Sequence, residues 1–119
     1  MITDRDRQVI RLIVERQLLA FQQNDDQSAF SLASPNIRKK FVTAESFVYM
    51  VKRNYPAVYR PRGVIFEELD LSQEVPTQPV LLLSPNGALV RAIYVMEQQA
   101  DYNWRINGCY LMSLNERIN

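Results

Sequence analysis

The spacing of apolar residues changes near the middle of the chain. From residue 4 to residue 55 they recur every three or four positions, as on one side of a helix. From residue 64 onward they alternate with polar residues or run together, as in strands. The segment 55–62, with its two prolines, separates the two patterns. This order predicts an α+β fold in which N-terminal helices pack against an antiparallel sheet.

Helix boundaries are marked by residues that cap free backbone groups. The predicted N-caps are Thr3, Asp25 or Asp26, Ser34 and Thr43. Pro35 follows Ser34 at the first helical position, where proline is favoured. Pro56 ends the helix that begins after Thr43, because the residue before a proline avoids the helical region.

Strands are predicted at 64–71, 80–83, 88–98 and 104–114. Turns at 84–87 and 100–103 join the last three into a meander. Regular alternation places Trp104, Ile106, Tyr110 and Met112 on one face of the last strand and Arg105, Asn107, Cys109 and Leu111 on the other. The predicted core contains Ile10, Ile13, Val14, Phe21, Phe47, Val51, Leu82, Ile93, Val95, Trp104 and Ile106.

Length and composition are those of an ordinary globular protein. The 119 residues fit a single domain, 1–119, and 47% of them are apolar. The single cysteine, Cys109, excludes an internal disulfide. No apolar run approaches the roughly 20 residues needed to cross a bilayer, and the charged N-terminus lacks the apolar stretch of a signal peptide. We therefore expect a cytoplasmic protein with no membrane partner.

The net charge of +1 argues against nucleic acid as a partner. Residues 1–62 hold 11 Lys and Arg against 6 Asp and Glu, and residues 63–119 hold 3 against 7. The basic clusters at 38–40 and 52–53 are too short for a nucleic-acid surface, and we interpret them as solvated helix faces.

Several segments resemble one bacterial family. The matching strings are 33–38, 41–47, 50–62 and 104–109, and the most specific is Tyr-Pro-Ala-Val-Tyr-Arg-Pro at 55–61. Together they look like the bacterial domain of unknown function 4864. That family is similar to the nuclear transport factor 2-like superfamily, which includes SnoaL-like proteins. The resemblance implies a cystatin-like or nuclear transport factor 2-like cone, in which helices pack into a strongly curved antiparallel sheet with a pocket at its open end.

The resemblance carries no reaction over to this chain, because the superfamily holds enzymes and binding modules alike. The sequence has no histidine, and its strand acids lie outside apolar stretches. We therefore predict no catalytic residue, no metal site and no cofactor. Without a base, and with Arg105 roughly 13 Å away along a strand, Cys109 is interpreted as an inert, packed thiol.

The densest group of rings and guanidinium side chains lies near the junction between helices and sheet. It comprises Tyr49, Tyr55, Tyr59, Arg60 and Arg62. In one interpretation these residues bind a ligand at a pocket mouth, with arginine holding a carboxylate or phosphate. In the other, Tyr55 and Tyr59 wedge the junction and hydrogen-bond to the backbone.

The strands carry more apolar residues than one sheet face can hold. Leu81, Leu83, Leu89, Val95, Leu111 and Leu114 cannot all point inward, because strand side chains alternate. We therefore expect a homodimer made by the sheet, with Leu83 and Leu111 in the interface. The function predicted from the sequence is a non-catalytic binding or scaffolding domain that self-associates. The alternative is a small-ligand carrier or enzyme that uses the cone pocket, its small-molecule or protein partner unknown.

Overall fold

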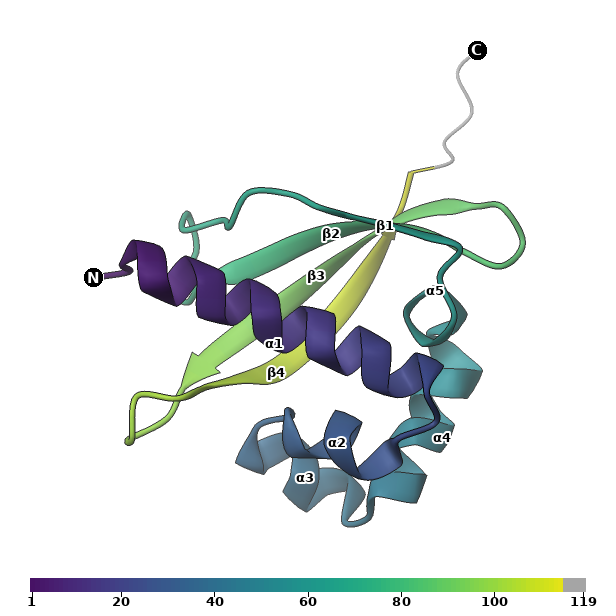
Figure 1. Cartoon of the computed structure of the whole chain (residues 1–119), viewed down its shortest axis with the longest axis horizontal. Helices are drawn as coiled ribbons and strands as arrows, with labels where there is room; N and C mark the ends of the chain where they lie inside the picture. Colours follow the sequence, from purple (N-terminus) through teal and green to yellow (C-terminus); the bar gives the residue numbers. More distant parts are fainter. Residues whose placement is uncertain (115–119) are drawn as a thin grey trace.

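A long N-terminal helix lies along one face of a four-stranded antiparallel sheet, and four shorter helices follow it in the chain (Figure 1). The structure is a computed structural model that describes residues 1–114. The helices are α1 (Asp4–Gln22), α2 (Asp26–Ser31), α3 (Pro35–Phe41), α4 (Ala44–Asn54) and α5 (Pro56–Tyr59). The strands are β1 (Gly63–Phe66), β2 (Thr77–Leu83), β3 (Leu89–Gln98) and β4 (Trp104–Ser113).

The helix starts are those that the capping residues predict. Thr3, Asp25, Ser34 and Thr43 each accept a hydrogen bond from a backbone N–H in the first turn of the next helix. At α1 the cap is reciprocal: the Thr3 hydroxyl accepts from the Asp6 N–H at 3.0 Å, and the Asp6 carboxylate accepts from the Thr3 N–H at 2.9 Å.

Pro56 ends α4 as predicted, but it also begins a further helix. Helix α4 stops at Asn54, and Pro56 occupies the first turn of α5, a four-residue helix that the sequence analysis did not predict. Both outcomes have the same cause, because proline is excluded from a helix interior and favoured in a first turn.

The sheet is a meander in the order β1-β2-β3-β4, with antiparallel neighbours throughout. The first strand is shorter than the predicted 64–71. It pairs with β2 only from Gly63 opposite Leu83 to Phe66 opposite Val80. The continuous ladder stops where β2 reaches Pro79, which has no N–H to donate and accepts a bond from the Glu67 N–H at 3.1 Å. Pairing resumes at a single bridge, in which Asp70 lies opposite Thr77.

A bulge in β4 changes the alternation of its side chains. Val95 pairs with Gly108 and Met96 pairs with Ile106, so Asn107 is an extra residue without a partner in β3. The alternation predicted for this strand is therefore wrong beyond Ile106. Trp104, Ile106, Cys109 and Leu111 pack on the core side, and Tyr110 and Met112 lie on the opposite side.

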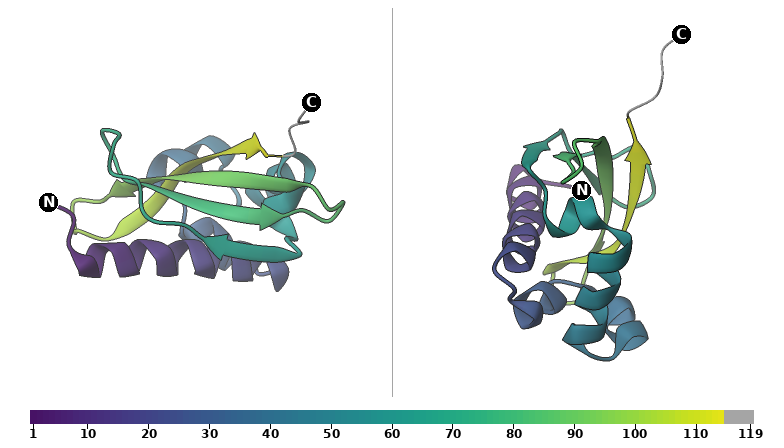
Figure 2. Two further views of the ribbon diagram at one scale, coloured as in Figure 1. Left: turned by 90° about the horizontal axis from the view of Figure 1, so that it is seen from above. Right: turned by 90° about the vertical axis from the view of Figure 1, so that its right-hand side faces the viewer.

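The sheet is open and not strongly curled, which differs from the strong curvature predicted from the sequence (Figure 2). Helix α1 lies along one face, which we call the inner face, and no helix of residues 1–114 lies across the opposite, outer face (Figure 2).

Of the predicted core residues, Val95 alone is only partly buried, and Ile93 is buried outside the main core cluster. Every helix among residues 1–114 is too short or too polar to cross a membrane.

Candidate functional site

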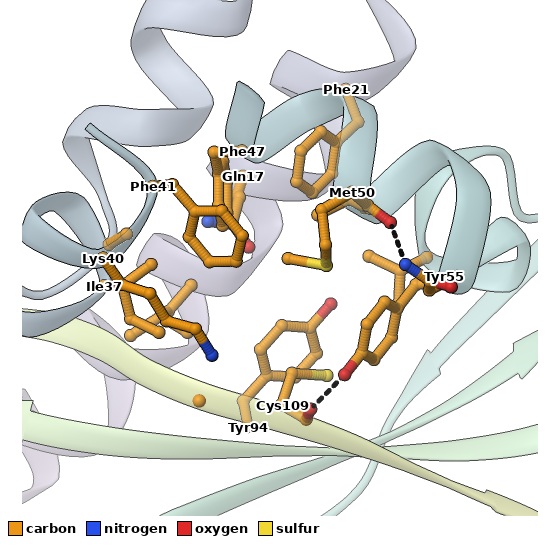
Figure 3. A pocket seen from close by; sticks show the side chains of 16 residues that line it. Gln17, Phe21, Ile37, Lys40, Phe41, Phe47, Met50, Tyr55, Tyr94 and Cys109 are labelled. Carbon is orange, nitrogen blue, oxygen red and sulfur yellow. Dashed lines mark hydrogen bonds between the residues drawn. The ribbon is translucent and has the colours of Figure 1, made fainter. Parts of the chain in front are cut away.

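A cavity of about 340 Å³ lies between the helices and the inner face of the sheet (Figure 3). Its size is within the range of small-molecule pockets. Residues from α1, α3, α4, α5, β3 and β4 surround it, and apolar side chains predominate. The lining residues are Gln17, Phe21, Ala33, Ile37, Lys40, Phe41, Phe47, Met50, Val51, Asn54, Tyr55, Val58, Tyr94, Ile106, Gly108 and Cys109.

Three phenylalanines form one wall of the cavity. Phe21 comes from the end of α1, Phe41 from the end of α3 and Phe47 from the first half of α4. The ring centre of Phe47 lies 6.2 Å from that of Phe21 and 5.7 Å from that of Phe41. Such tilted pairs stabilise each other beyond their area burial. The wall is therefore a fixed aromatic surface contributed by three separate helices.

A strained turn sets the position of Phe41 relative to α4. Val42 has a φ of 71° and a ψ of −48°. The Thr43 N–H donates to the Phe41 carbonyl oxygen at 2.8 Å, which closes a γ-turn around Val42. A β-branched residue at positive φ is an outlier that costs on the order of 1–3 kcal/mol. This turn places the Phe41 ring on the cavity while Thr43 caps the next helix.

Tyr94 brings a hydroxyl group into the apolar cavity. Its side chain lies on the inner face of β3 and is about 1% exposed. Among the buried side-chain nitrogen and oxygen atoms of residues 1–114, the Tyr94 hydroxyl oxygen is the one without a hydrogen-bond partner. Figure 3 shows this oxygen pointing toward the middle of the cavity. Leaving such a group unsatisfied costs about 1–3 kcal/mol.

Burial also fixes the protonation state of two lining groups. It raises the pKa of the Tyr94 hydroxyl, with a smaller contribution from Cys109, and it raises the pKa of the Cys109 thiol to about 12. Both groups are therefore neutral at pH 7. Cys109 is partly exposed as a residue, but its sulfur lies in the cavity wall (Figure 3). This agrees with an inert thiol rather than a nucleophile.

Three other polar side chains of the lining already donate to backbone carbonyl oxygens. Gln17 is 3% exposed, and its Nε2 donates to the Ala29 carbonyl oxygen at 3.1 Å. The Tyr55 hydroxyl donates to the Cys109 carbonyl oxygen at 3.3 Å. The Asn54 amide donates to the Met50 carbonyl oxygen at 3.1 Å. Tyr94 therefore stands apart as the buried lining donor without a protein partner.

Lys40 and Asn54 are exposed and mark the mouth of the cavity. The Lys40 ammonium lies 5.4 Å from the centre of the Phe41 ring, and Figure 3 shows it turned toward the cavity. No Asp or Glu is among the lining residues. Within residues 1–114 no group of three or more His, Cys, Asp or Glu side chains is arranged to hold a metal ion.

One of the five predicted ligand-binding residues, Tyr55, lines the cavity. Tyr49 is exposed and its hydroxyl accepts a hydrogen bond from Arg53 at 2.8 Å. The Arg62 N–H donates to the Leu83 carbonyl oxygen at 2.7 Å. For Tyr49, Tyr59, Arg60 and Arg62, which lie outside the cavity wall, a role in ligand binding stays a prediction.

Tyr59 and Arg60 contact the end of α1 instead. The Arg60 guanidinium donates to the Phe21 carbonyl oxygen and, at 2.8 Å, to the Asn24 side-chain oxygen. The Tyr59 hydroxyl donates to the same Asn24 oxygen at 3.3 Å. The Arg60 guanidinium also stacks 4.3 Å from the centre of the Tyr59 ring. The Tyr59 hydroxyl therefore bonds to a side chain, whereas the Tyr55 hydroxyl makes the backbone bond of the structural interpretation.

Gln17 and Tyr94 were not predicted as site residues, although both leave a signal in the sequence. Gln17 lies in the apolar stripe of α1, between Val14 and Phe21, where a polar residue is unexpected. Tyr94 shares the inner face of β3 with Ala92 and Met96. A polar residue among the inward-facing apolar positions of a helix or strand indicates either a buried hydrogen bond or a binding site.

The outer face of the sheet is a second candidate surface. Strand pairing places these apolar residues on it: Ile65, Pro79, Leu81, Leu83, Leu89, Ile93, Val95, Tyr110 and Met112. Of the two predicted interface residues, Leu83 lies on this face, whereas Leu111 packs against the core on the inner face because of the bulge. Arg91 on the same face forms two hydrogen bonds to the Glu67 carboxylate, at 2.6 and 2.9 Å, and these lower the pKa of Glu67.

Comparison with known proteins gives one result. The family model described as "Domain of unknown function (DUF4864)" matches residues 3–118, almost the whole chain. Neither the search of curated proteins nor the search of solved structures found a match. The match agrees with the resemblance carried by the Tyr-Pro-Ala-Val-Tyr-Arg-Pro string. The chain therefore belongs to the family of the domain of unknown function DUF4864.

Proposed function

We propose that this chain is a small, non-catalytic binding domain that holds a small, mostly apolar molecule in the cavity between its helices and its sheet. The observation that carries the proposal is the Tyr94 hydroxyl, buried without a partner and pointing into a cavity of about 340 Å³. A cavity that served only packing would be filled by apolar side chains, because an unsatisfied hydroxyl destabilises the fold.

The lining supports binding rather than catalysis. A general base at neutral pH needs a group that can accept a proton there, usually His, Asp or Glu. No such residue lines the cavity. The pKa values of Tyr94 and Cys109 are raised, so both groups stay protonated. Lys40 lies at the exposed mouth rather than beside them.

A neutral fluorescent probe tests the proposal. N-phenyl-1-naphthylamine should bind the purified chain with saturation. Met50→Trp fills the cavity and should abolish this binding, since Met50 lines it. Tyr49→Trp is the matched control: it adds a tryptophan at the neighbouring, 60% exposed position of α4 and should leave the binding unchanged. Unsaturable binding, or equal binding by both variants when both are folded, contradicts the proposal.

A second candidate function, self-association, is favoured by the outer face. Its apolar residues span all four strands. The charges of Arg91 and Glu67 on this face already pair with each other within one chain. A second copy of the chain, related by a two-fold axis, would cover the same patch on both partners. The resemblance to the nuclear transport factor 2-like superfamily is part of this proposal, because many relatives in that superfamily assemble in this way. A cytoplasmic location stays a prediction from the sequence.

A further inference from the structure

The Tyr94 hydroxyl also determines which chemical class of ligand suits the cavity. We infer that the cavity takes an uncharged, ring-containing molecule whose carbonyl oxygen accepts a hydrogen bond from the Tyr94 hydroxyl. This inference rests on the proposed function and adds the identity of the polar contact. Three observations carry it: the donor without a partner, the absence of a buried cation and the aromatic wall.

The ligand has to supply a hydrogen-bond acceptor. Tyr94 keeps its proton because burial raises its pKa, so the hydroxyl can donate. None of the neighbouring polar groups accepts a hydrogen bond from the Tyr94 hydroxyl in the structure. The Tyr55 hydroxyl and the Gln17 amide nitrogen, which also line the cavity, already donate to backbone carbonyl oxygens. A carbonyl oxygen brought by the ligand would satisfy this buried donor.

The polar end of the ligand is expected to be neutral. A carboxylate placed beside Tyr94 would lose its hydration without gaining an opposite charge, which is costly. The lining holds one cationic side chain, Lys40, at the exposed mouth, while Tyr94 is about 1% exposed. A ketone or a related carbonyl compound meets the same hydroxyl without that penalty, because it carries no charge to desolvate.

The shape of the cavity favours a ring. Phe21, Phe41 and Phe47 present a wall of tilted rings, against which a flat ligand packs well. A cavity of about 340 Å³ has the volume of roughly ten waters, since one water occupies about 30 Å³ of liquid. That volume fits a molecule of one or two fused rings rather than a large cofactor.

Three probes with one carbon skeleton separate these features. Tetralin offers the rings alone, 1-tetralone adds a carbonyl oxygen, and tetralin-1-carboxylate adds a charge. Titration calorimetry of the full chain should show 1-tetralone binding about threefold to tenfold more tightly than tetralin, the range for one added neutral hydrogen bond. The carboxylate should bind more weakly than the ketone.

Two tyrosine variants assign the contact. Tyr94→Phe should still bind tetralin, and it should bind 1-tetralone with about the same affinity as tetralin. In the control Tyr55→Phe, which removes the hydroxyl already bonded to Cys109, the preference should persist. Thermal melting of each variant verifies that it is folded. Tyr94→Phe should melt at the wild-type temperature or above, because the lost hydroxyl had no partner.

The outcomes separate the inference from the proposed function. Equal affinities for tetralin and 1-tetralone in the wild type overturn the carbonyl contact but leave cavity binding intact. A preference for the ketone that survives Tyr94→Phe also overturns it. Tightest binding of the carboxylate, lost in Lys40→Ala, would place the polar end at the mouth and overturn it as well. If none of the three probes and no neutral dye binds, the proposed function itself fails.

Discussion

Arg60 closes the C-terminal end of α1 by donating a hydrogen bond to the carbonyl oxygen of Phe21, a residue 39 positions earlier in the chain. The last turn of α1 has no basic residue of its own. The Arg60 guanidinium therefore supplies the positive charge that the end of a helix favours. It also bonds to the side chain of Asn24, which turns the chain away from α1 at a φ of 57°.

Arg60→Ala is expected to destabilise the fold by about 1–3 kcal/mol, since a charged hydrogen bond to a helix carbonyl is lost. Urea unfolding followed by circular dichroism measures this change. Arg62→Ala is the control, because only the backbone N–H of Arg62 is seen to make a hydrogen bond. Unchanged stability in Arg60→Ala, together with loss of binding for an anionic ligand, would restore the ligand-binding interpretation of Arg60.

Val42→Gly is expected to stabilise the protein by about 1 kcal/mol. Val42 is 76% exposed, so the substitution removes little packing, and glycine adopts a φ of 71° without the clash of a β-branched side chain. Chemical denaturation measures the difference. Val75→Gly is the matched control: Val75 is exposed but does not have a positive φ, so that variant should be destabilised. A loss of stability in Val42→Gly would mean that the turn carries no strain.

Cys109 should react slowly with a thiol reagent in the native state. With a pKa of about 12, about one thiol in ten thousand is ionised at pH 8, against about one in four for an ordinary cysteine. Labelling with Ellman's reagent should therefore accelerate about tenfold per pH unit from pH 7 to pH 10. The chain unfolded in guanidinium is the control and should react rapidly. A native rate that levels off near pH 8.5 would disprove burial of the thiol.

The raised pKa of Cys109 also affects stability, with a definite sign. Above the unfolded pKa of about 8.5, the unfolded chain releases the thiol proton while the folded chain keeps it. The free energy of unfolding should therefore fall as the pH rises from about 8.5 toward 12. Cys109→Ala should remove this contribution, and a comparison of the two pH profiles isolates it from other titrating groups.

Self-association through the outer face can be tested by mass. Light scattering at micromolar concentration should give twice the chain mass of 13.9 kDa. Tyr110→Lys adds a charge to the outer face at a 52% exposed position and should yield a monomer. Leu12→Lys, at a 42% exposed position of α1, is the control and should leave the dimer intact. A wild-type mass of one chain would rule out the dimer.

The helix boundaries could be predicted from sequence because their causes are local. Each cap joins residues three positions apart, such as Thr3 with Asp6 and Thr43 with Ser46, so a short window of sequence contains both partners. The causes that set the strand lengths are less local. The end of β1 at Phe66 depends on Pro79, which is distant in sequence and acts only once the two strands are paired.

The candidate site was mostly beyond sequence analysis for the same reason. Tyr55 was identified because rings and charges cluster around it in sequence. For Tyr94, by contrast, the sequence shows a polar group among apolar ones, but its lack of a partner emerges only when α1, α3 and α4 come together over β3. Whether a buried polar group is satisfied depends on groups from several elements, and the pattern of one strand does not contain them.

The extra residue in β4 also has a consequence for how the gene for this protein can change. The Asn107 side chain accepts a hydrogen bond from the Ser34 hydroxyl at 2.6 Å, so the bulge is tied to the start of α3. Loss of this one codon would make the strand regular and exchange the two faces of everything after it. Tyr110 and Met112 would turn toward the helices, and Cys109 and Leu111 toward solvent. A substitution in this strand changes one side chain, whereas a single in-frame deletion would exchange the inner and outer side chains of half the strand.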